Sequence, residues 1–110
     1  LDIIETEPKQ FQLVLYSIIQ LTKKAKGEDG DKFFTGDVYN YYQELCGNTK
    51  TDSLTQRRIS DILAEIDMLG LINAKVISKG RHGRTREIKL SIPSNLFDKV
   101  EAMLTDSLGI

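Results

Sequence analysis

The chain has 110 residues, of which 40% are hydrophobic and 28% are charged, and its formal net charge is −1. These values exclude a disordered chain and favour one domain with a single core over residues 1–110. Every apolar stretch is shorter than the roughly 20 residues that cross a membrane, and a lone cysteine, Cys46, excludes an internal disulfide. We therefore expect a cytoplasmic protein without a membrane partner. Because Leu1 rather than Met opens the sequence, we also expect a piece of a longer protein.

The first half of the chain predicts two helices with a short strand between them. The first helix should begin near Thr6 to Pro8 and end at Gly27. Its apolar residues recur at helical spacing, namely Phe11, Val14, Leu15, Ile18, Leu21 and Ala25. Residues 33–34 favour a strand, and Thr35 is the expected N-cap of a second helix that ends at Gly47.

The second half predicts a third helix, a hairpin and a final helix. Thr55 is the expected N-cap, Gly70 the end, and the apolar stripe consists of Ile59, Ile62, Leu63, Ile66 and Leu69. Residues 71–78 and 86–92 have the composition of strands, and residues 96–104 form an amphipathic helix. This order predicts an α+β winged helix-turn-helix: a three-helix core, a small antiparallel sheet with a basic wing, and a C-terminal helix.

Positive charge is concentrated on the third helix and the hairpin. Residues 55–89 carry eight basic and four acidic side chains, whereas residues 1–54 carry six and nine, and residues 90–110 carry one and three. A local basic face on a nearly neutral domain is typical of a nucleic-acid footprint.

The third helix is the candidate reading element. The N-terminal residues of the second helix in a helix-turn-helix unit reach base edges in the major groove. Gln and Arg side chains make bidentate contacts with adenine and guanine, so Gln56, Arg57 and Arg58 are candidates, with Thr55 and Ser60 beside them. An isolated pair of arginines would more often mark a solvated helix start. The basic hairpin downstream favours DNA contact.

The hairpin tip is the candidate wing. It contains Lys79, Gly80, Arg81, His82, Gly83, Arg84, Thr85 and Arg86. Its two glycines keep the tip slender, so that arginines can enter a nucleic-acid groove. The alternative is a soluble hairpin whose charges prevent edge-to-edge association.

Enzymatic and metal sites are not expected. One His and one Cys, far apart in the sequence, make no metal ligand set, and no nucleophile arrangement accompanies Asp61, Glu65 and Asp67. Cys46 is expected to be a small buried residue, and the four tyrosines to be core or boundary residues. We expect His82 to make a polar or stacking contact, or to be exposed to solvent.

Residues 54–92 closely resemble the C-terminal winged-helix domain of archaeal replication initiators, the proteins related to the origin recognition complex and the cell-division-control helicase loader. The resemblance rests on TQRRISD, then MLGLI, then KGRHGRT at these spacings, with GDVYNYYQELC upstream. It implies binding to double-stranded origin DNA, with Thr55 to Arg58 at the major groove and Lys79 to Thr85 at the minor groove. His82 stands where the family pattern has an aromatic residue, and the loop 48–53 also departs from it.

The resemblance further implies an ATPase module upstream, which alone would bind ATP and magnesium, so that no cofactor is expected in this chain. The module itself and a replicative helicase are implied partners, and the nucleoid is the implied location. Two rival interpretations stay open, a winged helix used for protein docking and a transcriptional regulator of the same fold. An apolar patch on the recognition face would favour docking.

Overall fold

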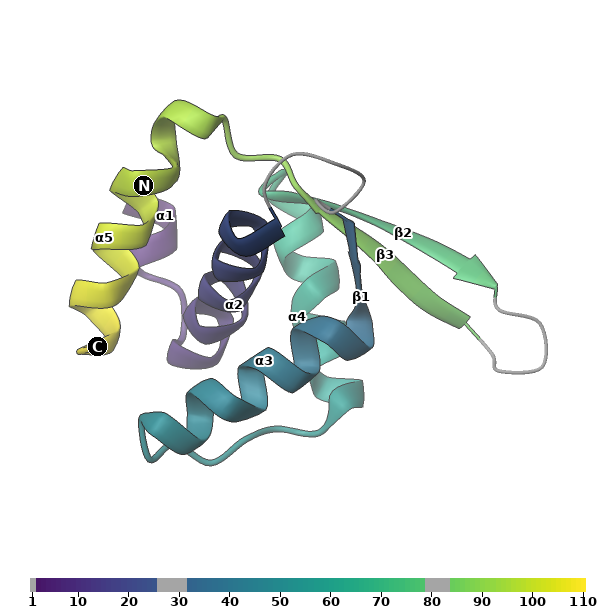
Figure 1. Ribbon diagram of the computed structural model, residues 1–110, viewed down its shortest axis with the longest axis horizontal. Coiled ribbons are helices and arrows are strands. Elements are labelled where there is room, and N and C mark those ends of the chain that lie inside the picture. Colours follow the sequence, from purple (N-terminus) through teal and green to yellow (C-terminus); the bar gives the residue numbers. More distant parts are fainter. Residues whose placement is uncertain (1, 26–31, 79–83) are drawn as a thin grey trace.

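The computed structural model describes residues 2–25, 32–78 and 84–110 and shows a winged-helix fold, as the sequence predicted (Figure 1). In chain order the elements are α1 (Asp2–Glu5), α2 (Lys9–Ala25), β1 (Lys32–Phe34), α3 (Thr35–Asn48), α4 (Gln56–Met68), β2 (Ile72–Ser78), β3 (Arg84–Leu90), the 3-10 turn η3 (Ser94–Leu96) and α5 (Phe97–Leu108). The sequence did not predict α1. Gly27, the expected end of the first helix, lies outside the described residues.

Helix α2 is the centre of the core. It packs against α3, α4, α5 and β3, so it is buried on more than the one face that its periodicity predicted. Leu13, Ser17 and Ile19 are buried in addition to the expected stripe. Ser17 satisfies its hydroxyl by donating to the Leu13 carbonyl at 2.8 Å. Pro8 directly precedes the helix, and its carbonyl accepts a hydrogen bond from the Gln12 N–H at 3.1 Å.

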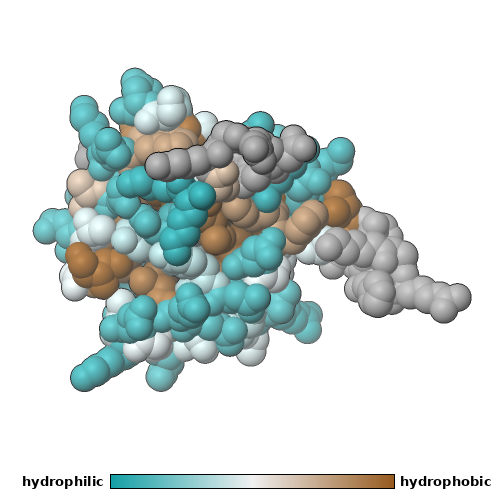
Figure 2. All heavy atoms as spheres, in the orientation of Figure 1, coloured by the Kyte–Doolittle hydropathy of each residue, from teal (hydrophilic) through white to brown (hydrophobic). Residues whose placement is uncertain are grey.

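The sheet is antiparallel with the order β1–β3–β2. Phe33 of β1 and Ala74 of β2 both lie opposite Ile88 of β3. Since side chains alternate between the two faces of a strand, these residues share the face that packs on the helices, together with Ile72 and Leu90. β2 and β3 project beyond the helices, and hydrophobic surface is visible at this projection (Figures 1 and 2).

The start of α3 differs from the prediction by one residue. Phe34, not Thr35, occupies the N-cap position, and its N–H donates to the Asp37 carboxylate at 3.0 Å. Thr35 is the first residue of the helix and is almost fully buried, 4% exposed. The helix ends at Asn48, one residue after the predicted Gly47.

Helix α4 begins as predicted, with the Thr55 hydroxyl accepting a hydrogen bond from the Arg58 N–H at 3.3 Å. It ends at Met68, and Gly70 follows with a φ of +78°, a left-handed conformation that favours glycine. The Gly70 N–H donates to the Asp67 carbonyl at 2.9 Å. Leu69, which the sequence placed in the apolar stripe, is 45% exposed because the chain has already left the helix.

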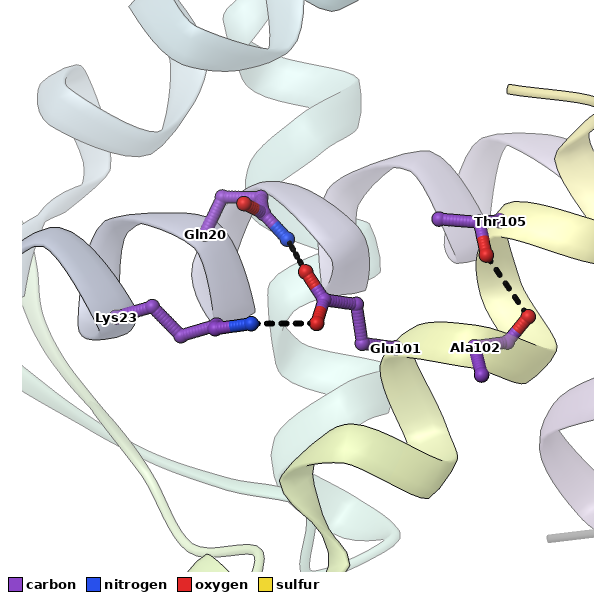
Figure 3. A network of polar contacts seen from close by, with 5 residues as sticks. All are labelled: Gln20, Lys23, Glu101, Ala102 and Thr105. Carbon is purple, nitrogen blue, oxygen red and sulfur yellow. Dashed lines mark hydrogen bonds and ion pairs between the residues drawn. The ribbon is translucent and has the colours of Figure 1, made fainter.

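Helix α5 covers α2 on the side away from the wing (Figure 1). Val100 and Leu104 are buried there, and the Glu101 carboxylate accepts hydrogen bonds from Lys23 and Gln20 of α2 (Figure 3). Throughout the described part of the chain, helices are too short or too polar to pass through a bilayer.

Candidate nucleic-acid interface

The first turn of α4 presents the predicted reading residues to solvent. Gln56, Arg57 and Arg58 are exposed, whereas Ile59, directly after them, is completely buried. Ser60 is half-buried and lies one turn beyond Gln56, on the same side of the helix. The structure therefore brings four predicted residues together at one end of a helix that its apolar face fixes to the core.

Two tyrosines of α3 fix the residue that precedes the Thr55 cap. The Tyr42 hydroxyl accepts a hydrogen bond from the Leu54 N–H at 2.7 Å and donates to the Gln10 side-chain oxygen at 2.5 Å. The Tyr39 hydroxyl donates to the Leu54 carbonyl at 3.0 Å. Burial is the main reason that the pKa of Tyr42 is raised to about 12, so its hydroxyl stays protonated. The sequence predicted the tyrosines to be core or boundary residues, but it gave no signal for these hydrogen bonds.

A groove separates the start of α4 from the projecting part of the sheet. We name it the helix–wing groove, and it is lined by Thr35, Gln56, Ser60, Val76, Thr85 and Arg86. Its volume is about 290 Å³. Gln56, Ser60, Thr85 and Arg86 were predicted from the sequence. Thr35 was predicted only as a cap, and Val76 was not singled out.

The wing is only partly described. Thr85 and Arg86 lie in β3 and are half-buried, and Arg84 is the first residue of that strand. The tip that the sequence singled out, Lys79, Gly80, Arg81, His82 and Gly83, lies outside the described residues. Its contacts with DNA stay a prediction.

The cations of the interface are available to an anionic ligand. Among the described residues, the side chains of Arg57, Arg58 and Arg86 form no ion pair with a carboxylate. On the sheet, Lys32 forms an ion pair with Glu87, one residue beyond Arg86, at 3.8 Å. Guanidinium groups that are not neutralised by the protein can bind phosphates bidentately.

The thiol of Cys46 also lies among the described residues and could in principle act as a nucleophile. Cys46 is buried, and burial raises the pKa of its thiol, which disfavours the reactive thiolate. In the same part of the chain, no three His, Cys, Asp or Glu side chains are grouped so that they could hold a metal ion.

The model of the family described as "CDC6, C terminal winged helix domain" matches residues 2–100. The chain belongs to this family. Among curated relatives, the ORC1-type DNA replication protein 1 of Methanosarcina acetivorans is 51% identical over 92 residues, which are 84% of this chain and 22% of that protein. The ORC1-type DNA replication protein of Pyrococcus furiosus is 52% identical over 94 residues, 84% of this chain and 21% of that protein. The chain thus spans about a fifth of the length of these relatives.

Solved structures show the same winged-helix arrangement. The Aeropyrum pernix ORC1 protein, solved in complex with DNA, superposes with a TM-score of 0.79 at 36% identity, covering 96% of this chain and 25% of that one. The Cdc6p of Pyrobaculum aerophilum superposes with a TM-score of 0.78 at 15% identity, covering 98% and 25%, and shares the fold. The resemblance drawn from residues 54–92 is confirmed at the level of the family.

Proposed function

We propose that this Cdc6-family domain binds double-stranded DNA at replication origins, as part of a longer initiator. In this proposal α4 enters the major groove and the basic wing approaches the minor groove. The observation that carries the proposal is the exposed first turn of α4, where Gln56, Arg57 and Arg58 stand together without an acidic partner among the described residues. The DNA complex of the related Aeropyrum protein supports the ligand class.

The main rival is a winged helix that docks on another protein. That function favours an apolar surface on the recognition face, because the cores of protein–protein interfaces are depleted of charged residues and enriched in aromatic and other apolar ones. Here the first turn of α4 exposes one amide and two guanidinium groups. This composition favours an anionic partner over an apolar one.

The wider role is also part of the proposal. The matched part of the chain covers only about a fifth of each relative, and we propose that an upstream ATPase module would supply ATP and magnesium chemistry and would be the domain's partner within the same protein. A replicative helicase is the proposed partner outside it. The domain itself would contribute DNA contact and no catalytic step.

The test is a salt titration of binding to origin-derived and random duplexes. Lysine and arginine release condensed counterions, so log K should fall linearly with log salt, with a slope of about −0.9 for each phosphate contact. Arg57→Ala and Arg58→Ala should weaken binding and make the slope less negative by about one for each phosphate contact that is lost.

Lys99→Ala is the matched control, because it removes one exposed cation from α5. It should leave both the affinity and the slope unchanged. Equal losses in all three variants would mean that the attraction is not confined to the face of α4. Absence of duplex binding at low salt would overturn the proposal.

A further inference from the structure

The sheet carries one valine that the core does not cover. Along β2, the residues that face the helices are Ile72, Ala74 and Val76, and Val76 lies opposite Arg86. Ile72, at the start of β2, is 2% exposed, whereas Val76, near its end, is 52% exposed. β2 and β3 project past the helices (Figure 1). Val76 therefore belongs to the inner face of the sheet but lacks the helix that would normally bury it.

Among the described residues that line the helix–wing groove, Val76 is also the one apolar residue. The other lining side chains, Thr35, Gln56, Ser60, Thr85 and Arg86, all carry hydrogen-bond donors. A ligand that fills the groove must combine groups that accept hydrogen bonds with an apolar surface at one place. The backbone of a DNA strand does so, since anionic phosphates alternate with deoxyribose rings whose C2′ methylene is apolar.

We infer that Val76 contacts the C2′ side of a deoxyribose while Arg86 binds a neighbouring phosphate, so that the domain discriminates against ribose at this position; the inference rests on the proposed DNA-binding function. A ribose there would place its 2′-hydroxyl against the valine methyl groups. That hydroxyl would lose water without gaining a partner, and an unsatisfied polar group weakens binding.

The location of the helix–wing groove supports a DNA backbone strand as its occupant. The groove is continuous with the first turn of α4, because Gln56 and Ser60 line it from that side. A duplex whose major groove receives α4 must bring one backbone strand past the groove toward the wing. The cations Arg57, Arg58 and Arg86 lie in these same elements, so the attraction for phosphate and the apolar contact belong to one surface.

The experiment is a ribose scan of the duplex that binds best in the salt titration. Single deoxyribonucleotides of each strand are replaced in turn by ribonucleotides, and affinity is measured by fluorescence anisotropy. The wild-type domain should lose about tenfold in affinity at one or two adjacent positions of one strand, the effect of a single unsatisfied hydroxyl group.

Val76→Thr supplies a hydroxyl in nearly the same shape and keeps a residue suited to a strand. It should bind the all-deoxy duplex more weakly than the wild type, because its hydroxyl then meets the C2′ methylene without a partner, and ribose at those positions should no longer cause the tenfold loss. Ile77→Thr is the matched control: the same kind of change, one residue further along β2 and on the other face of the sheet. It should retain the loss. Thermal melting of each variant shows whether it is folded.

Three results would overturn the inference. A flat ribose scan with tight duplex binding would remove the deoxyribose contact while leaving the proposed function intact. If ribose substitution costs Val76→Thr as much affinity as it costs the wild type, the ribose acts through the shape of the duplex and not through a contact with residue 76. If uracil in place of thymine reproduces the loss and ribose does not, Val76 contacts a base methyl group instead.

Discussion

The Thr35 hydroxyl accepts a hydrogen bond from the backbone N–H of Arg86 at 3.2 Å and so joins the start of α3 to the wing strand β3. β1 ends at Phe34, whose partner in β3 is Glu87. The Thr35 side chain therefore supplies an acceptor for the next residue of β3, where the β1 ladder has stopped. One hydroxyl group couples the helix-turn-helix unit to the base of the wing.

Replacing Thr35 tests this coupling. Thr35→Val keeps the shape of the side chain and removes the acceptor, so the Arg86 N–H is left without its partner at a partly buried site. We expect a loss of about 1–3 kcal/mol in the free energy of unfolding. Thr35→Ser keeps the hydroxyl and should lose less, and urea denaturation of the three proteins measures the difference. A loss in Thr35→Ser without any loss in Thr35→Val would show that the methyl group, not the hydrogen bond, matters.

The two threonines that were predicted as caps, Thr35 and Thr55, show what local sequence can and cannot predict. Thr55 follows a polar loop, and its own hydroxyl accepts from the Arg58 N–H in the first turn of α4, so the local pattern was sufficient. Thr35 follows a strand residue, and Asp37 lies where it can satisfy the N–H of Phe34 instead. The Thr35 hydroxyl then pairs with Arg86, 51 residues away in the sequence, and no local pattern reports a partner at that distance.

The same reasoning applies to the candidate site. The exposed positions of Gln56, Arg57 and Arg58 followed from the apolar stripe of α4, because the periodicity fixes which side of a helix faces outward. Val76 could not be found in this way. Its exposure depends on how far the hairpin projects past α4, which is a tertiary property that no local pattern reports.

Mutations in α4 should separate stability from recognition. Ile66 is completely buried, so Ile66→Ala should lower the free energy of unfolding by about 2–5 kcal/mol through lost burial and a cavity. Gln56 is exposed, so Gln56→Ala should change stability by less than about 0.5 kcal/mol and reduce discrimination between origin-derived and random duplexes. Denaturant melts and competition binding measure the two effects. A strongly destabilised Gln56→Ala that keeps its selectivity would show that the proposed orientation of α4 on DNA is wrong.

The contact between α2 and α5 should make stability depend on pH (Figure 3). Hydrogen bonds from Lys23, at 2.5 Å, and from Gln20 lower the pKa of the Glu101 carboxyl below its usual value. A lowered folded-state pKa stabilises the fold above the unfolded pKa of about 4.3 and ceases to do so as pH falls through the folded value. We expect Glu101→Gln to lower the free energy of unfolding at pH 7 by up to about 1 kcal/mol, since the ion pair is partly exposed.

The difference between wild type and Glu101→Gln should shrink as the pH falls below the unfolded pKa of about 4.3, because the wild-type carboxylate becomes protonated and loses its charge. Added salt should also reduce it at pH 7, because solvent ions screen exposed pairs. Asp106→Asn removes another carboxylate of α5, one that forms no ion pair among the described residues, and serves as the control. A difference that stays constant between pH 7 and pH 3 would mean that the charge of Glu101 contributes nothing.

The wing arginines can be tested without knowledge of their contacts. Arg84 is the first residue of β3 and follows the glycine at the tip, where a planar guanidinium suits a narrow groove better than an ammonium group. An arginine in a narrow minor groove gains from the strong negative potential there, so we expect Arg84→Ala to weaken binding by about 1–3 kcal/mol. Arg84→Lys should recover only part of this loss, because it restores the charge without the planar fork.

Lys79→Ala should instead weaken binding about equally on every sequence and make the salt slope less negative by about one. Binding of the three variants to matched origin-derived and scrambled duplexes distinguishes the two roles. Full recovery of affinity in Arg84→Lys would show that the wing contributes only positive charge to DNA binding.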